Sequence, residues 1–230
     1  MPDTARLSIV IPTLNEAATI EKLLIPLRQW RLNAVETVVV DGGSHDDTLA
    51  RARPLASTLI VSAPSRARQM NAGAREARGH HLLFLHADTR LPRGADRLIA
   101  SALSSKQCWG RFDVRLEGRH PLLPVIATAM NLRSRLTGIA TGDQGLFMTR
   151  EAFDAAGGFP DQPLMEDIEM SRRLKRLSPP ACLRERVTTS GRRWEREGAW
   201  RTLLLMWRLR WRYWRGASAD ELARVYRHVR

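Results

Sequence analysis

Hydrophobic and polar residues follow one another in blocks that predict alternating strands and helices along the first half of the chain. Short runs rich in β-branched residues predict buried strands at residues 7–11, 36–40, 58–61 and 82–85. The intervening segments have apolar residues three and four positions apart, which predicts helices from Glu16 (capped by Asn15) to Trp30, from Asp46 onward, and from Ala67 to Ala77. This alternation predicts an α/β fold in which helices flank a mostly parallel sheet.

The pattern is less regular in the second half of the chain. It predicts strands at residues 108–116 and 146–148, and helices at 122–136, 151–156 and 165–177. The last of these helices begins with acidic residues and ends with basic ones, which is the charge order that the helix dipole favours.

From Gly198 onward the chain has a helical apolar stripe made of Trp200, Leu203, Leu204, Trp207, Trp211 and Trp214. Arginines lie mainly on the other faces of this helix, at positions 201, 208, 212 and 215. A second short helix is expected from Asp220 to His228, after a Ser218 cap. We therefore predict one main domain over residues 1–190 and a basic, Trp-rich helical extension over residues 191–230.

Composition narrows the class of protein. A chain of 230 residues with 43% hydrophobic residues is large enough for one domain with a real core. Two cysteines, Cys108 and Cys182, are too few for a disulfide framework, which favours a reducing compartment. The apolar runs are far shorter than the roughly 20 residues of a membrane span, and no signal pattern precedes Leu7. A cytoplasmic location is expected.

The net charge of +13 is concentrated at the C-terminal end. Residues 172–230 contain 17 Lys and Arg against 5 Asp and Glu, so most of the excess lies there. A basic tail on a nearly neutral body predicts an anionic partner. Three interpretations of the tail are open: packing against the domain or a second subunit, attachment to an anionic membrane surface, and, as the least favoured, nucleic-acid binding.

Polar residues follow three of the predicted strands at the point where each strand ends. They are Asn15-Glu16, Asp41 and His86-Ala87-Asp88. Parallel strands have their carboxyl ends at one edge of the sheet, where open α/β folds bind ligands. Gly42 and Gly43 would let the backbone approach such a ligand closely. The reactive centre is therefore expected around residues 82–89. Neither a dinucleotide fingerprint nor a P-loop occurs.

Six segments in order resemble the family 2 glycosyltransferases of the GT-A fold. They are IVIPTLNE at 9–16, VVVDGGS with DDT at 38–48, RARQMNAG at 66–73, HAD at 86–88, GDQG at 142–145 and LMEDIE at 164–169. The HADT and GDQG variants resemble a bacterial subfamily of short transferases. The resemblance implies a GT-A (Rossmann-like) domain over residues 1–190 and a hexosyltransferase-type enzyme using a nucleotide sugar, with UDP-sugar favoured.

The resemblance also implies roles for individual residues. Donor nucleotide binding falls to Pro12, Thr13, Asn15, Glu16, Asp41, Gly43, Arg68 and Asp88. Asp88 matches the second acid of the family's D-x-D element, which holds Mn²⁺ or Mg²⁺ under the donor diphosphate. This chain has His86 in place of the first acid, so His86 is a candidate metal ligand or a phosphate hydrogen-bond donor. In the segment SGRRW, Arg192 and Arg193 are candidates for contacting the diphosphate.

Asp167 is the expected general base, with Glu166 beside it. In inverting enzymes of this fold, a carboxylate of the Glu-Asp pair takes the proton from the acceptor hydroxyl. Adjacent side chains on a helix point about 100° apart, so only one of the two can face the site. Asp143 and Gln144 are expected on the acceptor side.

The sequence therefore predicts a metal-assisted, inverting glycosyltransferase that is cytoplasmic or peripheral on the inner face of a membrane. The acceptor and the oligomeric state stay open, with a homo-oligomer as one option. Two alternatives remain: a catalytically inactive nucleotide-sugar-binding protein, suggested by His86, and a basic membrane-surface adaptor that acts through its tail. A nucleotidyltransferase is disfavoured, because its Gly-rich, lysine-bearing N-terminal loop is missing.

Overall fold

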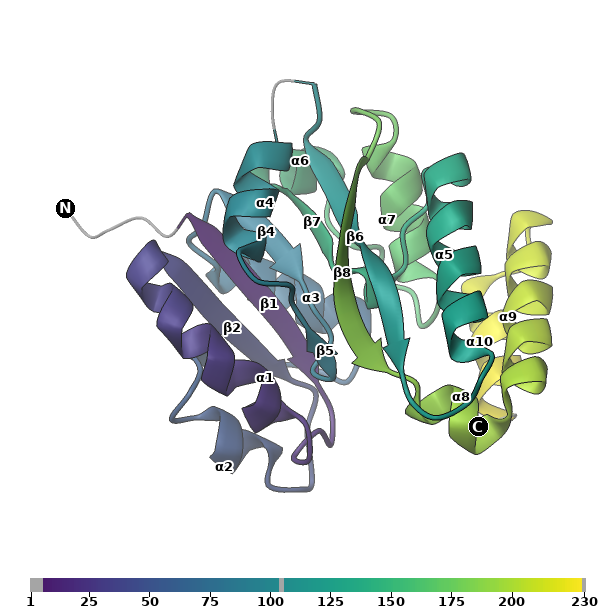
Figure 1. The fold of residues 1–230 in the computed structure, drawn as a ribbon, viewed down its shortest axis with the longest axis horizontal. Coiled ribbons are helices and arrows are strands. Elements are labelled where there is room, and N and C mark those ends of the chain that lie inside the picture. Colours follow the sequence, from purple (N-terminus) through teal and green to yellow (C-terminus); the bar gives the residue numbers. More distant parts are fainter. Residues whose placement is uncertain (1–5, 104–105, 229–230) are drawn as a thin grey trace.

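A single eight-stranded sheet organises the computed structural model, which describes residues 6–103 and 106–228. Its strand order is β3-β2-β1-β4-β7-β6-β8-β5 (Figure 1). The bounds are β1 (Leu7–Thr13), β2 (Val35–Asp41), β3 (Thr58–Val61), β4 (His81–Phe84), β5 (Thr89–Arg90), β6 (Trp109–Glu117), β7 (Leu146–Thr149) and β8 (Ala181–Ser190). Strands β1 to β4 pair in parallel, β7 runs antiparallel to β4 and β6, and β8 is parallel to β6. The predicted fold class is confirmed.

Helices cover both faces of this sheet. Their bounds are α1 (Ile20–Leu27), α2 (Thr48–Ala52), α3 (Arg66–Glu76), α4 (Ala95–Ala102), α5 (Leu123–Thr137), α6 (Arg150–Ala155), α7 (Glu166–Leu174), α8 (Arg192–Glu197), α9 (Ala199–Trp214) and α10 (Ala219–His228). Two 3-10 helices are η1 (Arg28–Asn33) and η2 (Gly142–Gln144).

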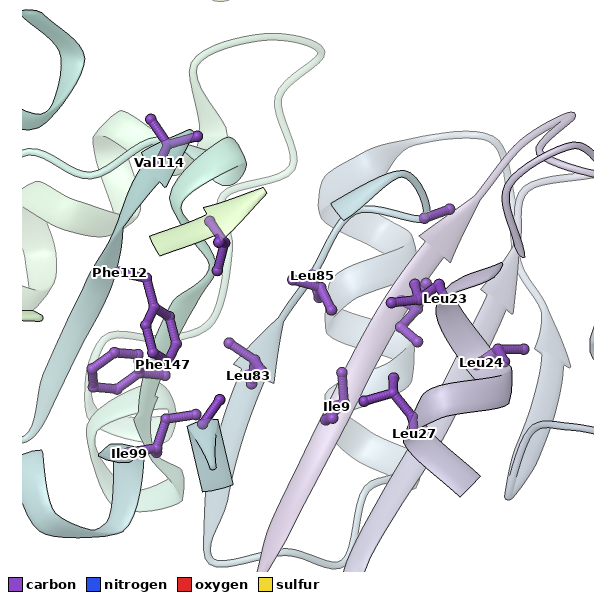
Figure 2. Packing of buried hydrophobic residues seen from close by; sticks show 14 of the residues in the cluster. Ile9, Leu23, Leu24, Leu27, Leu83, Leu85, Ile99, Phe112, Val114 and Phe147 are labelled. Carbon is purple, nitrogen blue, oxygen red and sulfur yellow. The ribbon is translucent and has the colours of Figure 1, made fainter. Parts of the chain in front are cut away.

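The hydrophobic core has two layers because side chains alternate along each strand. In β1, Ile9 and Ile11 point to the layer under α1, α4 and α5, whereas Val10 points to the layer under α3, α6 and α7. Figure 2 shows the first layer, where Ile9 and Leu83 lie between α1 and the ring of Phe147. The sheet is thus buried on both sides, as its nearly continuous apolar strands predict.

The N-terminal helix differs from its prediction. It begins at Ile20 and not at Glu16, and it continues as η1 after Leu27. Asn15 does not cap it: its backbone has a φ of 55°, and its side-chain oxygen accepts a hydrogen bond from the backbone N–H of His45. The segment before α1 therefore forms a loop that is tied to the loop after β2.

Strand pairing brings three of the polar loops to one edge. In the β1–β2 register, Thr13 lies opposite Asp41, so both strands end at the same level. Strand β4 pairs with the other side of β1, with Phe84 opposite Val10. The loops after β1, β2 and β4 consequently leave neighbouring strands in the same direction, as the sequence predicts.

The C-terminal extension is helical, as predicted, and it is packed on the rest of the chain. Leu209 on α9 is buried in a small cluster with Met165, Ile168 and Leu222. The first interpretation of the tail expected the tryptophan stripe to pack against the domain or a second subunit. In this chain, four of its tryptophans are more than half exposed: Trp200, Trp207, Trp211 and Trp214. Among the described residues, no helix is long and apolar enough to cross a membrane.

The close approach of α3 to the sheet depends on Gly73. A Cβ atom at this position would lie 2.4 Å from Val10 Cγ1 and 2.8 Å from Val40 Cγ2. We expect Gly73→Ala to lower the free energy of unfolding by about 1–3 kcal/mol through overpacking. This loss is expected even though alanine is more favourable than glycine inside a helix by about 1 kcal/mol. Urea unfolding measures the change.

The cost of Gly73→Ala should shrink in a Val10→Ala background, because the clashing methyl group is then gone. A cost that is the same in both backgrounds, or a stabilisation by Gly73→Ala in the native background, would contradict the close packing of α3 on β1.

Candidate active site

The loops after β1 and β2 are joined by hydrogen bonds between their backbones and side chains. The backbone N–H of Asn15 donates to Ser44 Oγ at 2.9 Å, and that of Glu16 donates to Thr48 Oγ1 at 2.8 Å. These bonds, together with the one from His45 to Asn15, hold the two loops as a unit. Asn15 and Glu16 stay at least partly exposed there, whereas Thr13 is buried.

Asp41 is fully buried and serves the loop that follows it. Its carboxylate accepts hydrogen bonds from the backbone N–H groups of Gly43 at 2.9 Å and Ser44 at 2.7 Å, and from the hydroxyls of Ser44 and Thr13. Gly43 adopts a φ of 90° in this turn, which favours glycine. Asp41 therefore holds the loop after β2 in shape, and the nucleotide contact that the resemblance implies stays a prediction.

A small hollow lies between the carboxyl edge of the sheet and the start of α7. Segments far apart in the sequence line it: Pro12 from β1, Arg66 from α3, His86 after β4, Gly142 from η2, and Glu166 and Asp167 from α7. The end of β1, the loop after β4 and the acid pair thus meet at this hollow, whereas the loop after β2, which was also expected here, is not among the residues that line it.

Both acids at the start of α7 line the hollow, so the expectation that only one of them can face the site is wrong, but the two have different partners. Glu166 is buried and its carboxylate lies 3.3 Å from the guanidinium of Arg66. Asp167 accepts hydrogen bonds from the backbone N–H of Gly142 at 2.9 Å and from its own helix at Ile168. Burial and the neighbouring charge of Glu166 raise the pKa of Asp167 to about 6, although Gly142 and Arg66 oppose the shift. Such a carboxylate can accept a proton near neutral pH.

The residue before this helix has a strained backbone. Met165 has a φ of 66°, in the left-handed region that an unbranched non-glycine residue seldom adopts. This conformation turns the chain so that α7 starts directly at Glu166, with Met165 itself buried beneath α9. Strained positions of this kind cluster at functional sites.

His86 is held inside the protein and faces Asp143. Its Nδ1 lies 3.3 Å from Asp143 Oδ1, and its Nε2 is buried without a hydrogen-bond partner against Gly142. A Cβ atom at Gly142 would lie 2.5 Å from that nitrogen, so the contact requires a glycine. Burial opposes ionisation of Asp143, but the hydrogen bond and charge of His86 hold its pKa below the ordinary value.

Asp88 is bound to the C-terminal extension by an ion pair. One of its carboxylate oxygens lies 3.3 Å from Arg192 Nη2, and the same nitrogen is 3.5 Å from Glu16 Oε2. The other carboxylate oxygen accepts a hydrogen bond from Thr189. Arg192 thus connects the loop after β1 with the loop after β4. Arg193 does not share this contact, because its guanidinium pairs with Glu197 and stacks on the ring of Tyr226.

The residues fit a divalent metal only in part. Within residues 6–103 and 106–228, no group of three His, Cys, Asp or Glu side chains is arranged to hold a metal ion. Asp88 fits as a single carboxylate ligand whose partners would be the phosphate oxygens of a nucleotide, which is a common mode for Mg²⁺. His86 does not fit the ligand role expected of it, because Nδ1 faces Asp143 and Nε2 is buried against the backbone.

Two more predicted residues are placed away from the hollow. Arg68 forms an exposed ion pair with Asp161 at 2.8 Å. Arg66, two positions earlier on α3, lines the hollow in its place. Gln144 is fully buried, and its side chain bonds with Thr141 and Asn131. Gln144 therefore shapes the η2 loop, whereas the side chain of its neighbour Asp143 is partly exposed.

Arg133 on α5 is a residue near the acid pair that the sequence did not single out. Its Nε and Nη2 atoms are buried without hydrogen-bond partners. Burial lowers the pKa of Arg133, while the charges of Asp167 and Asp143 oppose this shift. No motif marks this arginine, and α5 also contains Arg135, which pairs with Asp113. Only the tertiary structure distinguishes the two.

A model of the family described as Glycosyl transferase family 2 matches residues 8–155 of this chain. Two curated relatives, each called "PGL/p-HBAD biosynthesis glycosyltransferase" and found in Mycobacterium bovis and Mycobacterium tuberculosis, are 40% identical to the chain over 91 residues. This alignment spans only 36% of this chain and 36% of each relative.

Solved glycosyltransferase structures resemble the chain over 80% of its length. The mannosyltransferase PcManGT from Pyrobaculum calidifontis, solved with GDP-Man and Mn²⁺, has a TM-score of 0.61 at 21% identity, over 56% of that chain. TarS of S. aureus, solved with UDP, has a TM-score of 0.63 at 18% identity, over 60% of that chain. The M. tuberculosis glucosyl-3-phosphoglycerate synthase has 0.59 at 22%, over 71%. These likenesses confirm the GT-A fold.

The electrostatics of the acid pair can be tested without any substrate. We expect an NMR titration of the side-chain carboxyl carbons to give Asp167 a pKa of about 6. Glu166→Gln should lower this pKa, because it removes the adjacent negative charge and leaves Arg66 in place. The matched control is Glu169→Gln, one turn further along α7, where the carboxylate pairs with Arg173. A larger shift from the control than from Glu166→Gln would contradict this account.

Proposed function

Because the chain belongs to glycosyl transferase family 2, we propose that it transfers a sugar from a nucleotide-sugar donor to an acceptor hydroxyl, with inversion at the anomeric carbon. The observation that supports this proposal most directly is the carboxylate of Asp167, which lines the hollow and has a pKa raised to about 6. The curated relatives match over only about a third of their length, so the activity rests on this geometry.

Asp167 acts as the general base in this scheme. Its free carboxylate takes the proton of the acceptor hydroxyl while the hydroxyl oxygen attacks the anomeric carbon of the donor. The bond between that carbon and the phosphate oxygen breaks with its electron pair, and the nucleoside diphosphate leaves. The hydrogen bond from Gly142 to Asp167 orients the base, and the ion pair between Glu166 and Arg66 limits the charge that accumulates beside it.

The joined loops after β1 and β2 form the donor side of the proposed site. Pro12 lines the hollow, and Asn15, Glu16 and Gly43 are at least partly exposed in these loops. Carboxylate and amide oxygens in such loops can accept hydrogen bonds from ribose hydroxyls and from a uracil N–H. We favour a UDP-sugar as the donor. TarS binds UDP in its solved structure and PcManGT binds GDP-Man, so the fold accommodates either base.

Asp88 and Arg192 are the groups that we assign to the diphosphate. Asp88 would hold Mn²⁺ or Mg²⁺ together with phosphate oxygens, and the metal charge would stabilise the leaving group. Arg192 already lies between Asp88 and Glu16, where its guanidinium can donate charge-assisted hydrogen bonds to phosphate. The expected cytoplasmic location stays a prediction.

Asp167→Asn tests the proposal most directly. The amide keeps the shape of the side chain but cannot take a proton, so we expect transfer to fall by about 10²–10⁴-fold while nucleotide binding is nearly unchanged. The native enzyme should lose activity about tenfold per pH unit below about pH 6, where Asp167 becomes protonated.

The assay follows release of the nucleoside diphosphate from a panel of nucleotide sugars. Glu169→Gln is again the control, because it removes an acid from the same helix outside the hollow. Retained turnover in Asp167→Asn would remove Asp167 from this role. A native protein that binds nucleotide sugars but neither transfers nor hydrolyses them would favour the inactive binding protein.

Asp88 and Arg192 should affect nucleotide binding in different ways. We expect Asp88→Ala to remove most of the difference between UDP affinities measured by calorimetry with and without Mn²⁺. Arg192→Gln should weaken UDP binding about tenfold under both conditions, because it removes a charge-assisted hydrogen bond. Asp96→Ala, an acid on α4 away from the hollow, serves as the control. Unchanged titrations in both site variants would count against this diphosphate site.

A further inference from the structure

The outer face of α9 presents large apolar side chains to solvent. Their exposed fractions are 64% for Trp200, 65% for Leu204, 68% for Trp207, 57% for Trp211 and 73% for Trp214. Residues spaced three and four apart lie along one side of a helix, so these five form a continuous stripe. A contiguous apolar surface of this kind marks an interaction site. We call these five residues the α9 stripe.

Packing on the opposite side of α9 fixes the stripe in this orientation. Leu209 is buried there against Met165, Ile168 and Leu222, and Leu205 and Met206 pack around them. Turning the stripe inward would expose this cluster. The exposure of the tryptophans is therefore a consequence of how the helix is anchored, and a partner has to come from outside the described chain.

The charges on α9 itself are all positive, and of its arginines Arg212 pairs with Glu221 of α10. Helix α9 contains four arginines and no acidic residue. Arg201 and Arg208 are exposed beside the stripe, and the exposed Arg215 lies 5.0 Å above the ring of Trp211. Tryptophan next to arginine on an amphipathic helix is the composition that suits the headgroup layer of an anionic membrane.

A second copy of the chain is a poorer occupant of this face. In a two-fold contact the same patch meets itself, so the arginines beside one stripe would approach those beside the other with no acid on α9 to pair with them. A bilayer with anionic headgroups neutralises these charges and buries the tryptophans at the same time.

We propose that the α9 stripe docks on the surface of an anionic lipid bilayer, with α9 lying in the plane of the headgroups. With 16 residues, α9 extends along the surface without crossing it. The inner side of α9 packs on Met165 and Ile168, which flank the acid pair of α7. Docking thus holds the hollow about one helix diameter, roughly 10 Å, from the lipid. If the chain transfers sugars as proposed above, this arrangement places the acceptor hydroxyl at the membrane surface. Only this last point depends on the proposed function.

The test is co-sedimentation of the full chain with phosphatidylcholine vesicles that contain or lack phosphatidylglycerol. We expect binding to the anionic vesicles that weakens as salt is added. Replacing both Trp207 and Trp211 with Gln should reduce the partition coefficient at least about tenfold, because their rings no longer enter the headgroup layer. The control is Leu32→Gln, a 93% exposed apolar residue on η1 outside the α9 stripe.

A second set of variants tests the charges. Replacing Arg201, Arg208 and Arg215 with Gln should weaken binding to anionic vesicles about a hundredfold, since each arginine at such a surface contributes about fivefold. The matched control replaces three exposed arginines elsewhere, Arg28, Arg53 and Arg97, with Gln. It has the same net charge, so equal losses in the two triple variants would show that only overall charge matters and would overturn docking through α9.

Two other results would also overturn the proposal. One is that the native chain sediments as a dimer and does not bind vesicles, while the Trp207/Trp211 double variant sediments as a monomer. The other is no vesicle binding at low salt by a folded chain, as judged by thermal unfolding. The Asp167→Asn variant should bind vesicles like the native chain, so failure of docking and failure of the proposed chemistry give different results.

Discussion

The site depends on holding the adjacent carboxylates of Glu166 and Asp167 away from bulk water at the start of α7. Like charges so placed repel each other, and burial raises the cost. The fold offsets this cost for Glu166 with the Arg66 ion pair and for Asp167 with the backbone N–H of Gly142. The N-terminal end of α7 adds a favourable dipole. At Asp167 these contacts do not fully offset the effects of burial and of the Glu166 charge, so its pKa stays raised, at about 6. A fully compensated carboxylate would be a weaker base.

The parallel strands and the edge at which they end were the part of the fold most predictable from the sequence. Fully buried parallel strands consist of β-branched runs, and here these runs end at polar residues. The choice between Arg66 and Arg68 was not predictable from the motif. Two residues apart on a helix means about 200° of rotation, so the two arginines point in nearly opposite directions. The rotation of α3 is set by its contact with the sheet at Gly73, and it directs Arg66 to the hollow and Arg68 to Asp161.

Polar residues at strand ends posed a second limit on prediction from sequence. A carboxylate that faces a ligand and one that holds a loop occupy the same positions in the pattern. Asp41 is distinguished only by the donors that surround it, since two backbone N–H groups and two hydroxyls leave it no free face. Gln144 is likewise held by hydrogen bonds with Thr141 and Asn131, whereas His86 is enclosed by packing against Gly142. Strand β8 was missed because its middle is charged, at Arg184-Glu185-Arg186, and only its ends resemble a strand.

The tail shows why periodicity alone cannot decide which side of a helix is buried. Helix α9 has apolar residues on two sides, the α9 stripe and the side around Leu209. Flexible aliphatic side chains such as Leu205 and Met206 fit the irregular surface over Met165, whose strained backbone turns the chain into α7. Rigid indole rings suit a broad, partly wet surface better than this small cluster. The same contact therefore anchors the start of α7 and directs the tryptophans outward.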